Sequence, residues 1–268
     1  MIYGMCTNMN ARSTNDIGLD QSDYSKKIGL EYLELSVDRI MRYDENRFES
    51  FVKQVKESPL PVLACNNFVD ASIRLVGKDF DKNKFENYIN TALNRISSIG
   101  VKKVVFGSAK ARSIPSDISA EDGKNQVTER IKYIAGIAEK HEIEVEIEHL
   151  NRTECNVLNT FEETAALAKQ LARPNVKSIF DYYHFAVSGE REELIKQNQE
   201  WIGHMHFACT MGRLMPDLDE AKKLSSVFKL IKESTYNDTF SLEAYFPNTE
   251  MDNLYYKEVM DYIRGELV

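Results

Sequence analysis

The feature that most constrains the fold is an alternation of strand-like and helix-like segments along the whole 268-residue chain. Short runs of apolar and β-branched residues alternate with longer segments whose apolar residues recur three and four positions apart, which is typical of amphipathic helices. The short runs predict eight strands, at Ile2–Cys6, Tyr32–Leu35, Pro61–Cys65, Lys103–Phe106, Glu144–Glu148, Val176–Asp181, Trp201–His206 and Thr239–Glu243.

Helix signals lie between these strands. One helix is expected to begin after Asp81, as its cap, and to end before Gly100. Thr160 and Glu163 have the spacing of a capping box at the start of another helix. The segments after the first and sixth strands are less clearly helical, and a last helix over Leu254–Ile263 closes the chain.

Eight βα units in one chain of this length predict an α/β protein with a single-domain (β/α)8 TIM barrel over residues 1–268. The near-continuous apolar strands fit burial on both faces. An open doubly wound sheet is the competing architecture. It would usually carry a Gly-rich phosphate turn after the first strand, and the sequence there reads Gly4-Met-Cys-Thr-Asn.

Composition argues against several classes of protein. The formal charge of −8 argues against a nucleic-acid partner. No apolar run of about 18 residues is present, so we expect no membrane partner. The N-terminus lacks the basic region of a signal peptide, so we expect a cytoplasmic location. The four cysteines form no C-x-x-C pair, and we expect them to be free thiols in a reducing compartment.

Four residues of metal-ligand type end four consecutive predicted strands: Glu148, Asp181, His206 and Glu243. The carboxyl ends of parallel barrel strands meet at one mouth, where the catalytic groups of such barrels lie. Buried carboxylates that converge there need a cation or protons to offset their charge. Three carboxylates and one imidazole suit a single divalent cation, and the sequence therefore predicts a metal enzyme.

Further polar residues follow the same strands. Glu154 follows Glu148, His184 follows Asp181, and Arg213 follows His206. Each has a structural interpretation as well, because a loop ion pair, a buried satisfied imidazole or a surface charge has the same sequence signature.

Other polar residues near the predicted strand ends leave the same choice open. Arg112 is either a surface charge or, with Lys110, a group that meets a phosphate. His204 shares a strand face with His206 and is expected one layer deeper in the barrel, whereas His149 should point away from the lumen.

The blocks Glu148-His-Leu-Asn-Arg-Thr-Glu154, Asp181-Tyr-Tyr-His184, Gly203-His-Met-His206 and Leu242-Glu243-Ala-Tyr resemble the xylose-isomerase-like TIM-barrel superfamily. The sugar isomerase and epimerase branch is the most similar, and within it the ketose 3-epimerases of the tagatose/psicose (allulose) type. The similarity covers essentially the whole chain. The segment Phe207-Ala-Cys-Thr-Met-Gly-Arg213 departs from those epimerases and is one residue longer, which makes Arg213 a weaker match than His184.

The resemblance implies that Glu148, Asp181, His206 and Glu243 hold one Mn²⁺, Mg²⁺ or Co²⁺. It also implies a small-molecule sugar substrate whose oxygens contact Glu154, His184 and Arg213. In the mechanism we expect, a metal-stabilised enediolate forms while Glu148 and Glu243 act as the catalytic acid and base, one removing and the other returning the proton.

Cys65 and Asn66, which end the third predicted strand, either line the sugar pocket or pack as ordinary strand-end residues. Cys6 at the first strand has the same two interpretations. Nothing in the sequence separates a free sugar from a phosphorylated one. Relatives form dimers or tetramers, so a homo-oligomer is expected.

Other enzymes use the same set of metal ligands and remain alternatives. They are an aldose–ketose or hydroxypyruvate-type isomerase and an inosose dehydratase. An AP endonuclease on this barrel would need three zinc ions and extra histidines at strands two to four and seven. The stretches Leu33-Glu-Leu-Ser, Ala64-Cys-Asn-Asn67 and Phe106-Gly-Ser-Ala109 contain no histidine, which disfavours a nuclease. A non-enzymatic, sugar-sensing barrel is the remaining alternative.

Overall fold

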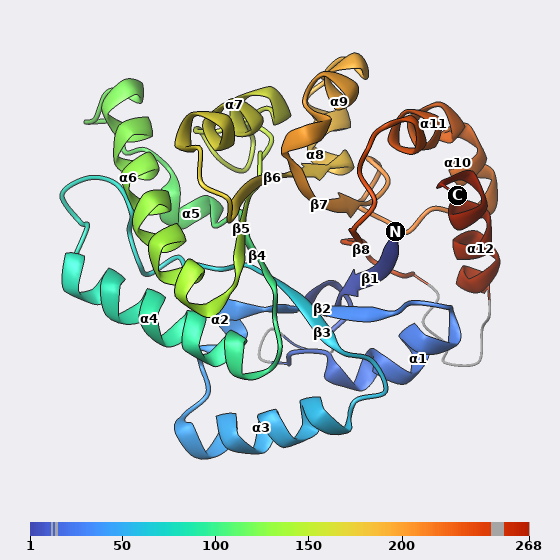
Figure 1. Ribbon diagram of the computed structural model, residues 1–268, viewed down its shortest axis with the longest axis horizontal. Helices are drawn as coiled ribbons and strands as arrows, with labels where there is room; N and C mark the ends of the chain where they lie inside the picture. The colour runs from blue at the N-terminus through green and yellow to red at the C-terminus, as the bar shows by residue number, and fades with distance from the viewer. Residues whose placement is uncertain (12, 14–15, 248–254, 268) are drawn as a thin grey trace.

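A computed structural model describes residues 1–11, 13, 16–247 and 255–267, and it contains a closed barrel of parallel strands surrounded by helices (Figure 1). The strands follow one another around the barrel in sequence order, and β1 pairs with β8 to close it. The strands are β1 (Ile2–Cys6), β2 (Tyr32–Ser36), β3 (Val62–Asn66), β4 (Lys103–Phe106), β5 (Glu144–Ile147), β6 (Val176–Asp181), β7 (Ile202–Phe207) and β8 (Thr239–Leu242). The predicted (β/α)8 barrel is confirmed.

The strand bounds differ from the predicted ones by at most one residue at an end. The differences at the carboxyl ends of the strands change where the expected metal ligands lie relative to the strands. β5 ends at Ile147 and β8 at Leu242, so Glu148 and Glu243 are the first residues beyond their strands. β7 continues to Phe207, which makes His206 its penultimate residue.

Helices and short 3-10 turns connect the strands and form the outer layer (Figure 1). The α-helices are α1 (Ser22–Lys27), α2 (Val37–Ile40), α3 (Glu45–Glu57), α4 (Lys82–Ser98), α5 (Ala109–Arg112), α6 (Ala120–Ala138), α7 (Phe161–Leu171), α8 (Tyr182–Val187), α9 (Glu193–Gln197), α10 (Leu218–Lys223), α11 (Ser225–Glu233) and α12 (Tyr255–Leu267). The 3-10 turns are η1 (Thr7–Met9), η2 (Leu19–Gln21), η3 (Glu139–His141) and η4 (Gln199–Trp201). None of the helices in the described ranges has the length and apolar character needed to cross a membrane.

The helix ends follow the capping signals with one exception. The Asp81 side chain accepts a hydrogen bond from the Lys84 amide at 3.0 Å, as an N-cap does. Thr160 caps α7 in the same way, but Glu163 accepts from the amide of Asn159 at 2.6 Å. The predicted capping box is therefore only half formed.

The described part of the last helix covers the expected segment except for its first residue. Leu254, the expected first residue of this helix, lies outside the described residues, and the described part, α12, runs from Tyr255 to Leu267, past the predicted end at Ile263.

Two kinds of core result from this architecture. The outward faces of the strands pack with the helices in one apolar cluster that includes Leu33, Leu35, Cys65 and Met205. The inward faces carry polar side chains as well. Glu34, Lys103, Glu146 and His204 are all buried there. A buried charge is costly unless it is paired, so each of these groups needs a partner inside the barrel.

Glu146 and Lys103 form such a pair at the amino-terminal end of the barrel. Lys103 Nζ lies 3.8 Å from Glu146 Oε1 and contacts Glu144 at 2.7 Å and Asp238 at 2.9 Å. Burial nevertheless raises the pKa of Glu146 to about 8, because desolvation outweighs the attraction of the lysine and the nearby acids add to the shift.

The raised pKa of Glu146 predicts a pH dependence of stability. Between the ordinary value of 4.5 and about 8, the folded protein keeps a proton that the unfolded chain has lost, so the free energy of unfolding falls as pH rises through this window. Glu146→Gln cannot ionise and should lack this component. We expect urea unfolding across the window to show a flatter profile for the variant. Parallel profiles for the two proteins would contradict the assignment.

Candidate metal centre

The four residues expected to bind a metal meet at the carboxyl-terminal mouth of the barrel. Glu148 follows β5, Asp181 ends β6, His206 lies in β7 and Glu243 follows β8. All four are buried, and one donor atom from each lies within 4.8 Å of the donor atoms of the others. Consecutive parallel strands explain this convergence, since their carboxyl ends lie side by side at one end of a closed barrel.

The ring nitrogen Nδ1 of His206 faces all three carboxylates. It lies 3.2 Å from Glu243 Oε2, 3.6 Å from Glu148 Oε1 and 3.7 Å from Asp181 Oδ2. Among the described residues, neither Nδ1 of His206 nor Oδ2 of Asp181 has a hydrogen-bond partner, although both atoms are buried. Buried polar atoms are nearly always satisfied, so these two atoms are available to a bound ligand.

The donor set fits a divalent cation. The other oxygen of Asp181, Oδ1, accepts from the backbone amide of His184 at 2.9 Å, which caps α8 and leaves Oδ2 directed at the mouth. One imidazole nitrogen and three carboxylate oxygens are ligands that Mn²⁺, Mg²⁺, Co²⁺ or Zn²⁺ accept. The residues present therefore suit one such ion.

The charges of these groups influence one another strongly. Burial alone would lower the pKa of His206, but the carboxylates of Glu34 and Glu243 hold it well above its ordinary value. Burial would raise the pKa of Asp181, but His184, His206 and Arg213 lower it. The site is thus built for negatively charged oxygens beside a positive charge.

Glu148 and Glu243 have different environments. Burial and the neighbouring Glu243 carboxylate raise the pKa of Glu148, against the effect of His206. For Glu243 the effect of burial is exceeded by Arg213 and His206, which lower its pKa. Two carboxyl groups with pKa values moved in opposite directions are suited to the acid and base roles of one proton transfer.

Arg213 is brought into the site by the loop after β7. Its guanidinium is hydrogen-bonded to Glu243, lies 3.7 Å from Asp181 Oδ2 and stacks over the ring of Tyr183 at 4.6 Å. The backbone of Arg213 has a φ of 53°, a left-handed conformation that is uncommon for a non-glycine residue. The structure therefore places Arg213 beside the expected ligands.

His184 and Glu154 lie beside the centre as well. The amide N–H of Asn151 donates to Nδ1 of His184 at 3.2 Å, so the ring proton is on Nε2. That Nε2 is buried and has no hydrogen-bond partner among the described residues. Glu154 accepts from the Asn151 side chain at 3.0 Å and lies 3.9 Å from Arg213.

Two residues around Glu148 have structural roles that the sequence did not indicate. Arg112 is fully buried and donates to the carbonyl oxygens of Phe106 at 2.8 Å and Glu148 at 2.7 Å. The interpretation of Arg112 as a surface charge or phosphate-binding group is therefore wrong. Gly107 leaves room for the Glu148 carboxylate, because a Cβ at this position would lie 1.9 Å from Oε2.

The two candidates of the third strand differ. Asn66 is buried at the end of β3 and donates to the side chain of Asn8 at 3.1 Å. Cys65 is fully buried within the apolar cluster between the strands and the helices. The structure therefore assigns Cys65 to the core, which was the ordinary packing alternative, and not to the group around His206.

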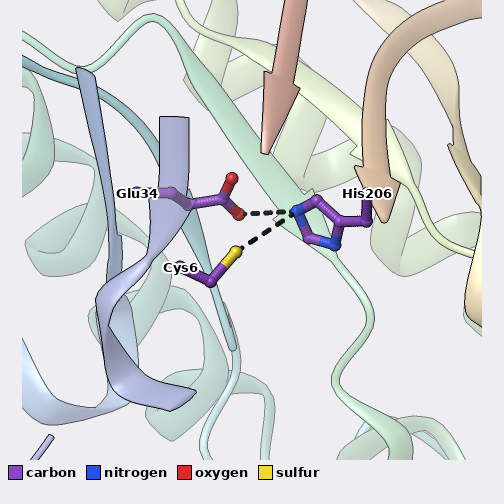
Figure 2. Close-up of side chains that lie close together, drawn as sticks. All are labelled: Cys6, Glu34 and His206. Atoms are coloured by element: carbon purple, nitrogen blue, oxygen red, sulfur yellow. Dashed lines mark hydrogen bonds and ion pairs between the residues drawn. The ribbon is translucent and has the colours of Figure 1, made fainter. Parts of the chain in front are cut away.

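One residue of the site was missed from the sequence. Glu34 in β2 is fully buried, and its Oε1 lies 2.9 Å from Nε2 of His206 (Figure 2). Burial would raise the pKa of Glu34, but His206 and His204 lower it well below its ordinary value. A charged residue inside the apolar run Tyr32-Leu-Glu-Leu-Ser was the available signal.

A family model described as the xylose isomerase-like TIM barrel matches residues 22–265. The chain belongs to this family. Membership in the xylose isomerase-like family confirms the resemblance seen in the strand-end blocks.

Similar proteins include isomerases and epimerases. An inosose isomerase of Bacillus velezensis is 24% identical over 83% of this chain and 81% of its own length. A D-psicose 3-epimerase of Agrobacterium fabrum is 27% identical over 67% of this chain and 63% of its own length. The crystal structure of the IOLI protein with a binding zinc atom shares the fold, with a TM-score of 0.66 and 21% identity over 99% of this chain and 96% of that chain. These relatives support the prediction of an enzyme.

Gly107→Ala should weaken metal binding while the barrel stays folded. The added Cβ would displace the Glu148 carboxylate, and we expect Mn²⁺ affinity to fall about 10–100-fold, as for other changes that misplace a ligand. Calorimetric titration with Mn²⁺ measures this. Gly136→Ala in α6 is the matched control, because its Cβ meets nothing closer than Arg173 at 3.7 Å. Equal Mn²⁺ affinities in the two variants would contradict the role of Gly107 in leaving room for the Glu148 carboxylate.

Proposed function

We propose that this chain is a divalent-metal-dependent sugar epimerase or isomerase, and that it epimerises a ketose at the carbon beside its carbonyl. The observation that carries the proposal is the convergence of Glu148, Asp181, His206 and Glu243 around one point, with Nδ1 of His206 and Oδ2 of Asp181 lacking hydrogen-bond partners among the described residues. Membership in a family that contains ketose 3-epimerases supports it.

In this proposal the four residues hold one Mn²⁺, Mg²⁺ or Co²⁺. Bound there, the ion would supply Lewis acidity, and the C–H beside the sugar's carbonyl would become acidic enough to lose its proton. The rest of the chemistry falls to side chains of this chain.

Glu148 and Glu243 exchange the proton. β6 and β7 lie between β5 and β8, so the two carboxylates reach the site from different strands. Ionised Glu243 takes the proton from one face of the carbon at a carboxylate oxygen, and protonated Glu148 gives one to the other face. The opposite pKa shifts favour this starting arrangement, and the roles exchange in the reverse direction.

His184, Arg213 and Glu154 position the sugar. The Nε2–H of His184 is a donor for a sugar oxygen, and the guanidinium of Arg213 adds positive charge beside the oxygens that become negative. Glu154 is partly exposed and accepts from a sugar hydroxyl. Fixed donors and acceptors of this kind lower the barrier by holding the substrate in its reactive geometry.

A second candidate is an inosose-type isomerase. The inosose isomerase of Bacillus velezensis aligns over 83% of this chain, a larger share than the psicose epimerase covers. In such a reaction the carbonyl changes position, whereas epimerisation leaves it in place.

A product screen separates the two candidates. The Mn²⁺-loaded protein is incubated in D₂O with D-fructose, D-tagatose, D-psicose and an inosose, and the products are identified by ¹³C NMR. A ketose whose configuration changes beside an unmoved carbonyl, with deuterium at that carbon, supports the epimerase. A carbonyl at a new carbon supports the isomerase, and conversion of none of these compounds rejects both.

The two-carboxylate mechanism makes a prediction for variants. Glu148→Gln and Glu243→Gln should each lower turnover by about 10²–10⁴-fold, because neither amide can accept or return the carbon-bound proton. Turnover is measured at saturating Mn²⁺, with bound metal confirmed by elemental analysis. Glu146→Gln, a buried glutamate at the far end of the barrel, is the matched control and should retain activity. Near-normal turnover in either metal-loaded Gln variant rejects the mechanism.

A further inference from the structure

A carboxylate below the candidate metal centre joins two histidines of the barrel interior. Glu34 is fully buried, and each of its oxygens lies 2.9 Å from a ring nitrogen, Oε1 from Nε2 of His206 and Oε2 from Nε2 of His204. The Oγ of Ser241 donates to Oε2 at 2.6 Å. Figure 2 shows the Glu34 carboxylate directed at the His206 ring.

The pattern of donors determines which ring nitrogen of His206 carries a proton. A carboxylate that receives the Ser241 hydroxyl and two imidazoles acts only as an acceptor, so Nε2 of both histidines donates. A neutral imidazole has one N–H. With that proton on Nε2, the lone pair of His206 is on Nδ1, the nitrogen that faces Glu148, Asp181 and Glu243.

We propose that Glu34 is a positioning residue that fixes His206 in the Nε2–H form and so presents the Nδ1 lone pair to the cation. The inference rests on the cation of the proposed function. A carboxylate on the far nitrogen also makes an imidazole a stronger ligand and sets the orientation of its ring.

His204 and Ser241 keep the Glu34 carboxylate in place. They occupy its second oxygen, and the Oγ of Ser241 in turn lies 2.7 Å from the Tyr32 hydroxyl. The Nδ1 of His204 is 2.7 Å from the Thr239 hydroxyl. With these partners the carboxylate cannot rotate away from His206 without losing hydrogen bonds in a buried site.

A second cation between Cys6, Glu34 and His206 is the competing interpretation. The donor atoms of these residues are close together, but Cys6 Sγ lies 3.7 Å from the same Nε2 that donates to Glu34 (Figure 2). An ion there would have to replace the Nε2 proton. The two interpretations differ in the number of ions bound by each chain.

The test compares Glu34→Gln with Glu146→Gln, the same substitution at a second fully buried glutamate of the barrel interior. The amide introduced by Glu34→Gln has one acceptor atom in place of two, and its NH₂ group favours an unprotonated Nε2 on a facing histidine. Metal-stripped protein is titrated with Mn²⁺ by calorimetry, without sugar. We expect one ion per wild-type chain, about 10–100-fold weaker binding in Glu34→Gln, and wild-type affinity in Glu146→Gln.

A second measurement needs no variant. In ¹⁵N-histidine-labelled, zinc-loaded wild type, the signals of only five histidines must be assigned. His206 should show a proton on Nε2 and none on Nδ1. This readout decides the question even where Glu34→Gln does not fold.

Four results would overturn the inference and leave the proposed function standing. They are Mn²⁺ affinity of Glu34→Gln equal to wild type, an equal loss in Glu146→Gln, two ions per wild-type chain, or a proton on Nδ1 of zinc-bound His206. A wild-type chain that binds no divalent ion overturns both this inference and the proposed function. A chain whose Mn²⁺ binding depends on Glu34 but that converts no sugar supports the inference and rejects only the proposed reaction.

Discussion

The structure depends on holding three carboxylates, from Glu148, Asp181 and Glu243, within a few ångströms of one another in a buried mouth. Their mutual repulsion and their loss of water would be costly without positive charge nearby. Among the described residues, the Arg213 guanidinium is hydrogen-bonded to Glu243 and brings positive charge to them, and the His206 ring lies beside them. In the part of the chain that the structure describes, Nδ1 of His206 and Oδ2 of Asp181 have no hydrogen-bond partner, and a divalent ion beside them would offset the remaining negative charge.

The surroundings of the centre follow from the same requirement. The buried guanidinium of Arg112 donates to the backbone carbonyl of Glu148 and fixes it in place. Gly107 leaves space for the Glu148 carboxylate. His206 is held from below by Glu34. Fixed supports of this kind hold these side chains in position, and they come from segments that are distant in sequence from the residues that they support.

Much of the fold and of the site was readable from the sequence. Strand-like runs and helical periodicity depend on residues within a few positions of one another, so the eight strands were placed to within one residue at each end. Arg112, Cys65 and Glu34 could not be placed in this way. Whether a charged side chain after or inside a strand is exposed or buried depends on which distant residues cover it, and local sequence contains no record of those contacts.

The order of the βα units, the closed parallel barrel and the ligand types at the ends of β5 to β8 all follow from the amino-acid sequence alone. The repeating local pattern specifies the strands and helices and their order. Once the strands form a parallel barrel, their carboxyl ends all lie at one mouth, so residues at strand ends meet there. The folded chain was needed to establish that Nδ1 of His206 faces the carboxylates while Nε2 faces Glu34. The orientation of a ring and the partner of each nitrogen are set by contacts across the lumen, and Glu34 and His206 are 172 positions apart in the chain.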